Sequence, residues 1–285
     1  MRALDARSAE FGLDRFVLLD VRDEHDFLDG HLEGSGHLPA AELTERRGEL
    51  PPRDTDILVV AADGVRARDA AQALEELGYR DVAWLDAALR ESAGERLVRT
   101  PPAALWRPSP FLEEVLPRLP EGRRRVLDLA AGAGRESVFM ALHGYEVEAW
   151  DHDRGALEKA AAMAHRHGVT ITTQTRDLET RDPRLPVESH DVVMVFRFLH
   201  RPLFPQIARA VAPGGVVVYE TYLRGQERFG RPKHPRFLLD PGELPRHFPG
   251  FEVEHHEERT PAEGPMLARL LARKIQGSSG GTSTP

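Results

Sequence analysis

The fold is decided by the stretch Val126-Leu127-Asp128-Leu129-Ala130-Ala131-Gly132-Ala133-Gly134-Arg135, followed by Tyr145-Glu146-Val147-Glu148-Ala149-Trp150-Asp151. An apolar strand runs into a turn of very small residues, a helix follows, and a second apolar strand ends on a carboxylate. Small residues let the backbone approach a ligand closely, and the N–H groups that open the helix point at it. Asp151 stands where a carboxylate can accept hydrogen bonds from both hydroxyls of a ribose. The pattern predicts a nucleotide site.

The spacing resembles the first two motifs of class I S-adenosylmethionine-dependent methyltransferases. Their first motif, Asp-x-Gly-x-Gly-x-Gly, falls here on Asp128, Ala130, Gly132 and Gly134. Because an alanine replaces the first glycine, Ala130 is expected to do without a positive φ. The rival pattern is the dinucleotide fingerprint of NAD(P)-dependent oxidoreductases, in which Ser137 would occupy the place of the third glycine.

The rest of this half supports the methyltransferase pattern. Apolar runs predict five buried strands, at residues 126–129, 146–150, 170–173, 191–195 and 216–219. The turn Val211-Ala212-Pro213-Gly214-Gly215 resembles the Leu-x-Pro-Gly-Gly turn before strand five of the family. Two further strands, 251–257 and 266–273, resemble the antiparallel hairpin that the family adds to its Rossmann-like sheet. The resemblance covers about residues 111 to 274 and implies a seven-stranded methyltransferase domain.

The resemblance also implies S-adenosyl-L-methionine as the cofactor. Asp128 is then expected to orient the turn and the amino group of the methionine moiety, and Asp151 to bind the ribose. His152 would flank the adenine, Asp177 would accept from the adenine amino group, and Phe196 would line the methionine end. Asp177 can equally be an ordinary surface carboxylate. The complete implied set is Asp128, Ala130, Gly132, Gly134, Asp151, His152, Asp177, Leu178 and Phe196.

Arg197 and His200 are the candidate catalytic residues, because α/β sheets place reacting groups at the carboxyl ends of their strands. His200 can act as a base near neutral pH, or it can cap the helix that begins around Pro202. Arg197 can bind an anionic acceptor or pair with an acidic neighbour. The segment around them is loosely similar to small-molecule methyltransferases of the tellurite-resistance type.

A long loop after the fifth strand supplies the candidate substrate residues. Long loops over a binding cleft commonly carry specificity, and an electropositive wall in an acidic protein suggests a small anionic acceptor. The alternative is a set of surface arginines paired with Glu220 and Glu227. The residues of the wall are Tyr222, Arg224, Arg228 and Arg231.

In the N-terminal half, Leu19-Asp20-Val21-Arg22, Gly30-His31-Leu32-Glu33-Gly34-Ser35 and Leu38-Pro39 resemble the opening of rhodanese domains, over about residues 8 to 90. Ala61 occupies the cysteine position of the family's Cys-x-x-Gly-x-Arg-Ser loop. Sulfur transfer in this family forms a persulfide on that cysteine, so the resemblance implies a catalytically inactive domain. The loop can still cradle a small anion through Arg66 and backbone N–H groups, or the domain can dock a protein partner. Alternatively, Arg66 makes only internal hydrogen bonds.

The length of 285 residues favours about two domains. A proline-rich stretch from Thr100 to Pro110 suits a connector between them. We predict a rhodanese-like domain at residues 1–95, a linker at 96–110, a methyltransferase domain at 111–275 and a disordered tail at 276–285. Both domains are expected to be α/β.

The composition excludes several other classes of protein. A net charge of −8 argues against nucleic acid and anionic membranes as partners. The absence of cysteine removes disulfides and thiolate metal sites, and we assign no metal ligands. Without a bilayer-length apolar run or a signal peptide, the cytoplasm is the default location. The favoured function is methyl transfer to a small molecule by a protein fused to an inactive rhodanese-like module; the alternative is a non-catalytic, cofactor-binding regulator.

Overall fold

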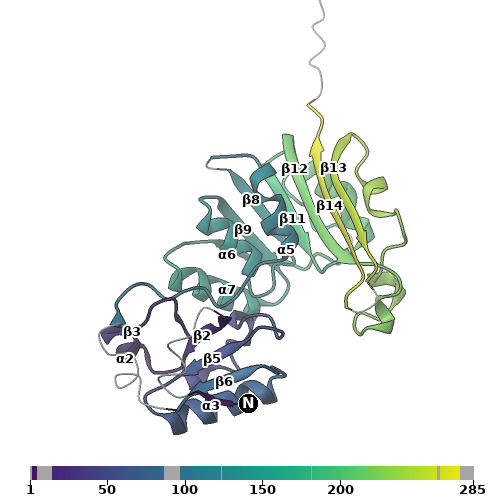
Figure 1. Cartoon of the computed structure of the whole chain (residues 1–285). Helices are drawn as coiled ribbons and strands as arrows, with labels where there is room; N and C mark the ends of the chain where they lie inside the picture. The colour runs from purple at the N-terminus through teal and green to yellow at the C-terminus, as the bar shows by residue number, and fades with distance from the viewer. Residues whose placement is uncertain are drawn as a thin grey trace, which may run out of the picture. The chain divides into compact units, whose positions relative to one another are not determined.

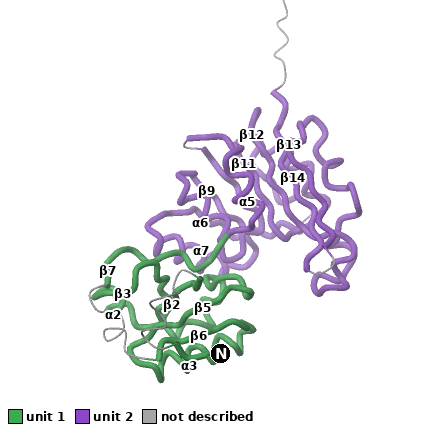
Figure 2. The backbone as a smooth tube through the Cα atoms, in the orientation of Figure 1, with its two compact units in different colours: residues 1–107 green, residues 108–285 purple. Residues whose placement is uncertain are grey.

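A computed structural model of the chain describes residues 2–4, 15–86, 97–122, 124–180, 182–261 and 264–276. The chain forms two compact units, residues 1–107 and 108–285 (Figure 2). Both are built from parallel sheets and helices, so the predicted α/β class is confirmed. The predicted disordered tail lies outside the described residues from Gly277 onward. Among the residues described, no helix is long and apolar enough to cross a membrane.

A five-stranded parallel sheet in the order β1-β6-β5-β2-β4 forms the core of the first unit (Figure 1). Its strands are β1 (Arg2–Leu4), β2 (Val17–Asp20), β4 (Gly36–His37), β5 (Ile57–Val60) and β6 (Val82–Leu85). Helix α2 (Glu24–Asp29) follows β2, and β3 (His31–Leu32) pairs separately with β7 (Leu97–Val98). Short 3-10 turns occupy residues 40–42 and 47–49.

Helix α3 (Gly64–Glu76) packs against β5 and β6 through its buried alanines and Leu74. Its start is fixed by Asp63, whose carboxylate accepts a hydrogen bond from the backbone N–H of Arg66 at 2.9 Å. An aspartate at the N-cap satisfies one of the unpaired donors of the first turn.

The second unit contains a seven-stranded sheet in the order β10-β9-β8-β11-β12-β14-β13 (Figure 1). Strand β14 is antiparallel to both β12 and β13, while the remaining pairs are parallel. The predicted terminal hairpin is therefore confirmed. The strands are β8 (Arg125–Leu129), β9 (Glu146–Asp151), β10 (Thr172–Thr175), β11 (His190–Phe196), β12 (Val211–Tyr222), β13 (Phe251–Arg259) and β14 (Leu267–Lys274).

Helices cover both faces of this sheet. On one face, Val192 and Met194 of β11 pack with α5 (Pro110–Val115) and α6 (Arg135–Leu142). On the other face, Val193 and Val195 pack with α8 (Phe204–Ala210). Helix α7 (Arg154–Arg166) follows β9, and short 3-10 helices occupy residues 116–118, 201–203, 226–228, 235–237 and 244–247.

Two strands differ from the sequence prediction at their starts. Strand β10 begins at Thr172 rather than residue 170, because Val169 and Ile171 pack as core residues before pairing with β9 starts at Thr172. Strand β12 begins at Val211 rather than residue 216, since Val211 already pairs with His190. The glycines of the intervening turn absorb a register shift between His190 and Val192.

Candidate functional site

The turn between β8 and α6 brings backbone to the carboxyl edge of the second sheet. Gly132 and Gly134 have φ of 54° and 77°. A Cβ on Gly132 would meet no atom within 4 Å, so open space lies against the backbone there. A Cβ on Gly134 would lie 2.5 Å from the Cβ of Ala160 on α7. One glycine therefore leaves room for a ligand, and the other allows the two helices to pack.

Ala130 also adopts a left-handed backbone, with φ of 59°, so the expectation that it would avoid positive φ is wrong. This conformation costs a residue with a Cβ about 1–2 kcal/mol. Hydrogen bonds on either side hold the turn in place: Ala131 N–H donates to the carbonyl of Trp150 at 3.0 Å, and Gly134 N–H donates to that of Ala131 at 2.9 Å.

Asp151 ends β9 opposite this turn and is 6% exposed. One carboxylate oxygen accepts from Gly132 N–H at 2.8 Å, and the other accepts from Asp153 N–H at 2.8 Å. The ring of His152 is 79% exposed, with its Nδ1 3.1 Å from the carboxylate. The structure thus places Asp151 and the small-residue turn together, as the sequence predicted.

Two further carboxylates lie behind the turn. Asp128 is 2% exposed and accepts a hydrogen bond from the Ser137 hydroxyl at 2.5 Å. Burial raises the pKa of Asp128 well above its usual range, and the charges of Glu136 and Asp151 add to the effect. Glu136, in the first turn of α6, accepts from Ser109 N–H at 3.1 Å, and burial raises its pKa too.

The two residues after β10 that the family resemblance assigns to adenine differ in their surroundings. Asp177 is exposed and caps its own turn by accepting from Glu179 N–H at 2.9 Å, whereas Leu178 is buried in the core beside Trp150. The Arg176 guanidinium lies 5.0 Å from the Trp150 ring centroid, and Glu148 accepts from the Trp150 indole N–H at 2.8 Å. In this structure Asp177 is an exposed turn residue, which agrees with the alternative that it is an ordinary surface carboxylate.

On the acceptor side, Arg197 follows β11 with φ of 57°. Its guanidinium is 3.0 Å from the carboxylate of Glu220 and 5.0 Å from the Tyr222 ring centroid. Glu220 is fully buried and also accepts from Ser109 Oγ at 3.0 Å and Arg269 Nε at 2.7 Å. The structure therefore joins two of the predicted residues, exposed Arg197 and half-buried Tyr222, in one polar cluster at the buried Glu220. Phe196 is buried among apolar residues beside α5.

Sequence reasoning gave no site role to Ser109, Glu136 or Arg269. A signal existed for the last of these, since it is a lone charge inside the apolar strand at 266–273. In the sheet, Arg269 is the cross-strand partner of Glu220. Ser109 and Glu136 carried no such signal, because only the tertiary fold brings the segment before α5 against α6 and β12.

The remaining predicted residues are engaged elsewhere. The His200 side chain is partly buried and makes no capping bond to the helix that follows. Arg224 forms an ion pair with Asp240, and the Nε of Arg228 donates to the carbonyl of Gly225 at 3.3 Å. Within the described chain, neither arginine bonds to the Arg197–Glu220 cluster. The predicted electropositive residues therefore do not form one connected group. Arg231 is exposed in the same loop.

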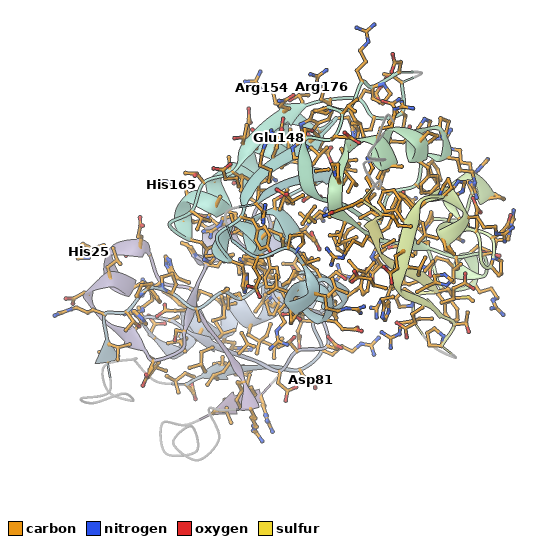
Figure 3. All side chains as sticks on the ribbon, turned by 90° about the horizontal axis from the view of Figure 1, so that it is seen from above. His25, Asp81, Glu148, Arg154, His165 and Arg176 are labelled. Atoms are coloured by element: carbon orange, nitrogen blue, oxygen red, sulfur yellow. The ribbon has the colours of Figure 1, made fainter. Side chains whose placement is uncertain are left out.

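The first unit contains a cavity of about 560 Å³ at the carboxyl ends of β2 and β5, and Ala61 lines it. Arg66 at its rim is 71% exposed and donates to Asp63 through its guanidinium at 2.7 Å. Arg22 is likewise bonded to Asp20. Since both arginines are internally paired and Asp23, Asp26 and Asp69 share the rim, the cavity does not favour an anion. Asp23 and Asp26 with exposed His25 (Figure 3) could also share a metal ion, but they form an open surface group.

Comparisons with known proteins agree with this architecture. Residues 3–93 match the model of the rhodanese-like domain, and residues 126–215 match that of a methyltransferase domain. A probable S-adenosyl-L-methionine-dependent methyltransferase, TehB of Haemophilus influenzae, is 31% identical over 88 residues, which are 30% of this chain and 30% of TehB. An uncharacterized protein of Schizosaccharomyces pombe, UNK4.09, is 22% identical over 282 residues, covering 79% of this chain and 82% of that protein.

The crystal structure of TehB from Haemophilus influenzae is 19% identical, with a TM-score of 0.48, and the match covers 57% of this chain and 61% of TehB. The chain thus spans less than two thirds of the TehB relatives in either comparison. The two family models match separate segments, one in each compact unit. The chain carries a rhodanese-like domain at its N-terminal side and a methyltransferase domain at its C-terminal side.

Proposed function

We propose that the second unit transfers a methyl group from S-adenosyl-L-methionine to a small anionic molecule. The observation that carries the proposal is the small-residue turn, open at Gly132 and fixed to Asp151 by a hydrogen bond of 2.8 Å. The match to the methyltransferase domain and the probable function of TehB support it.

The residues present fit this cofactor. Asp151 is a fixed acceptor for ribose hydroxyls, and the turn allows a close approach of the methionine moiety. Buried Asp128 suits the amino group of that moiety, since a buried carboxylate favours a cationic partner. Asp177, Leu178, His152 and Phe196 are proposed for the adenine and methionine ends only through the family resemblance.

Arg197 is proposed to bind the acceptor. The cofactor supplies an electrophilic methyl group, so the chain needs chiefly to align the acceptor and exclude water. Glu220 is shared between Arg197 and Arg269, and Arg269 also pairs with Glu257 at 3.2 Å, so Glu220 does not engage the guanidinium of Arg197 alone. The Arg197 side chain is 37% exposed, which leaves guanidinium N–H groups available to an anion. His200 is the proposed base where the acceptor carries a proton, and Tyr222, Arg224 and Arg228 border the route to the site.

We infer that the first unit is a non-catalytic binding or docking module. Ala61 stands at the base of its cavity, and a methyl side chain can neither attack nor carry sulfur. The rim carboxylates favour a partner that presents a basic group. A cytoplasmic location remains part of this proposal.

Two alternative functions, an NAD(P)-dependent oxidoreductase and a non-catalytic regulator, can be distinguished from a methyltransferase by measuring ligand binding and turnover. Against an oxidoreductase stand the antiparallel β14 in the sheet and Ser137, whose hydroxyl is bonded to Asp128 where the dinucleotide fingerprint needs a third glycine. A regulator without turnover would bind the cofactor and produce no S-adenosylhomocysteine.

The test is calorimetric titration with S-adenosylmethionine, S-adenosylhomocysteine and NAD(P), followed by turnover on a panel of thiols, oxyanions and carboxylates. Binding of the first two ligands and release of S-adenosylhomocysteine with an anionic acceptor are expected. Arg197→Gln should lower kcat/KM for that acceptor while the Kd for S-adenosylmethionine stays unchanged. Binding of NAD(P) alone would contradict the proposal, and binding without turnover on any acceptor would favour the regulator.

A further inference from the structure

Charges at the carboxyl edge of the second sheet are unevenly compensated. On the acceptor side, Glu220 is bonded to two guanidinium groups, those of Arg197 and Arg269. On the cofactor side, Asp128 and Glu136 form no ion pair within the described chain, and the nearby charge of Arg135 only partly offsets the effect of burial on Glu136. Their hydrogen-bond donors are neutral: the Ser137 hydroxyl for Asp128 and backbone N–H groups for Glu136.

Two such carboxylates are costly in the absence of a ligand. A buried charge without a partner is destabilising, and the charge of the half-buried Glu136 further disfavours ionisation of the buried Asp128. The raised pKa of both groups is the expected result. A bound cation would remove the penalty, so this part of the site is complementary to positive charge.

The position of Glu136 is set by one residue that links both sides of the site. Ser109 donates its N–H to Glu136 at 3.1 Å and its hydroxyl to Glu220 at 3.0 Å. Glu136 also stands in the first helical turn after the small residues 132–134. Ser109 and the first turn of α6 thereby hold the Glu136 carboxylate next to both the small-residue turn and the Arg197–Glu220 cluster, the two groups between which the proposed function places the reacting sulfur.

We propose that Glu136 is the residue by which this site distinguishes the positively charged sulfonium of S-adenosylmethionine from the neutral thioether of S-adenosylhomocysteine. This inference rests on the proposed function. In the reaction, an electron pair of the acceptor forms the new bond to the methyl carbon, the carbon–sulfur bond breaks and its pair remains on sulfur. Sulfur loses its positive charge and the acceptor gains one unit of positive charge. Glu136 then faces no cation at sulfur, and the chain holds the product more weakly than the substrate.

The test compares three ligands by calorimetry on the full chain: S-adenosylmethionine, S-adenosylhomocysteine and sinefungin, which carries an ammonium group near the sulfonium position. Glu136→Gln keeps an oxygen for Ser109 N–H and removes only the charge. The substitution should raise the Kd values for S-adenosylmethionine and sinefungin by about tenfold, the effect of one partly screened charge. The Kd for S-adenosylhomocysteine should change by less than about twofold. Glu252→Gln, on the exposed edge strand, is the matched control and should change none of them.

The outcomes separate this inference from the proposed function. If the wild-type chain binds none of the three ligands, the proposed function fails. If all three bind and Glu136→Gln weakens them equally, Glu136 contacts a part common to the ligands and the charge-sensing role is overturned. Should the variant not fold, the wild-type chain still decides, because equal affinity for charged and neutral ligands contradicts the inference.

Discussion

Ala130 and Arg197 hold left-handed backbone on the cofactor side and the acceptor side of the candidate site, with φ of 59° and 57°. Residues with a Cβ occupy this region at a cost, and such strain concentrates at functional sites. Arg197 is held there by its own N–H bond to the Glu220 carbonyl at 2.8 Å. The strained residues lie at the turn proposed to bind the cofactor and at the guanidinium proposed to bind the acceptor.

Ala130→Gly should stabilise the protein. Removing the strain gains about 1–2 kcal/mol, and the greater freedom of glycine in the unfolded chain returns about 0.5–1 kcal/mol. The net gain is therefore ~0.5 kcal/mol, measurable as a shift of the urea midpoint. Ala133→Gly in the same turn is the control. Because Ala133 has no positive φ, this substitution should destabilise the protein instead. Equal effects of the two substitutions would show that strain at Ala130 is not the cause.

Cofactor affinity should rise with pH through the raised pKa values of Asp128 and Glu136. Below those values the free carboxylates are protonated, and a cationic ligand favours the ionised form, so binding must release protons. The charges facing these groups are Glu136 and Asp151 around Asp128, and Arg135 and Glu220 around Glu136. Calorimetry in buffers of different ionisation enthalpy measures the release. Proton uptake on binding would contradict the sign of both shifts.

Ala61→Cys should give a thiol of ordinary pKa. The Asp63 carboxylate engages the backbone N–H and the guanidinium of Arg66, which are the groups that would stabilise a thiolate, and its own pKa is lowered by these bonds. Adding Asp63→Ala should free those donors and lower the thiol pKa, as measured by the rate of alkylation against pH. A low pKa in the single variant would show that Asp63 does not block the loop.

At the scale of elements, the loop between β12 and β13 is anchored by Glu243 and Arg201. Glu243 accepts from the Arg201 guanidinium at 2.7 Å and from Asp240 N–H at 2.8 Å, and His247 lies 3.1 Å away. Partial burial alone would raise the pKa of Glu243, but these hydrogen bonds outweigh it and lower the pKa to about 2. These contacts of Glu243 thus hold in place the loop that also carries Arg224 and Arg228.

Glu243→Gln should destabilise the protein by ~1 kcal/mol at neutral pH, the usual value for a hydrogen bond to a charged partner near the surface. Because the folded pKa is depressed, the contribution of Glu243 is complete above its ordinary value of 4.5 and is lost as the pH falls toward about 2. Urea unfolding across that range should show the wild type and the variant converging. A difference that persists in acid would exclude the ionised carboxylate as its source.

The elements of the sheet were predictable because buried strands are continuous apolar runs, and residues 192–196 and 216–219 carry that signal directly. The turn and Asp151 were predictable because small residues and a strand-end carboxylate are adjacent in the sequence. Glu136 and Ser109 were not, since they meet only through packing across residues far apart in the chain. The φ of Ala130 was mispredicted because its neighbours hold it against its intrinsic preference.

At the scale of the whole molecule, every residue proposed for the cofactor lies in the second unit. The segment from Pro108 to Gln276 should therefore fold alone and bind S-adenosylmethionine with the Kd of the full chain. Ser109 must be included, because its hydrogen bonds fix Glu136 and Glu220. Calorimetry on the isolated segment checks this expectation, and loss of binding would show that the first unit contributes to the site.

Strand β14 is the last strand in the sequence, yet it lies between β12 and β13. Until the ribosome has added residues 267–274, the edge of β12 has no partner on that side, and β13 has no strand to join. The nascent chain therefore exposes an apolar valine-rich edge, which is a template for aggregation, until residues 267–274 have been translated. Premature termination or slow decoding just before Leu267 should send this protein to chaperones and proteases rather than yield a shortened, folded product.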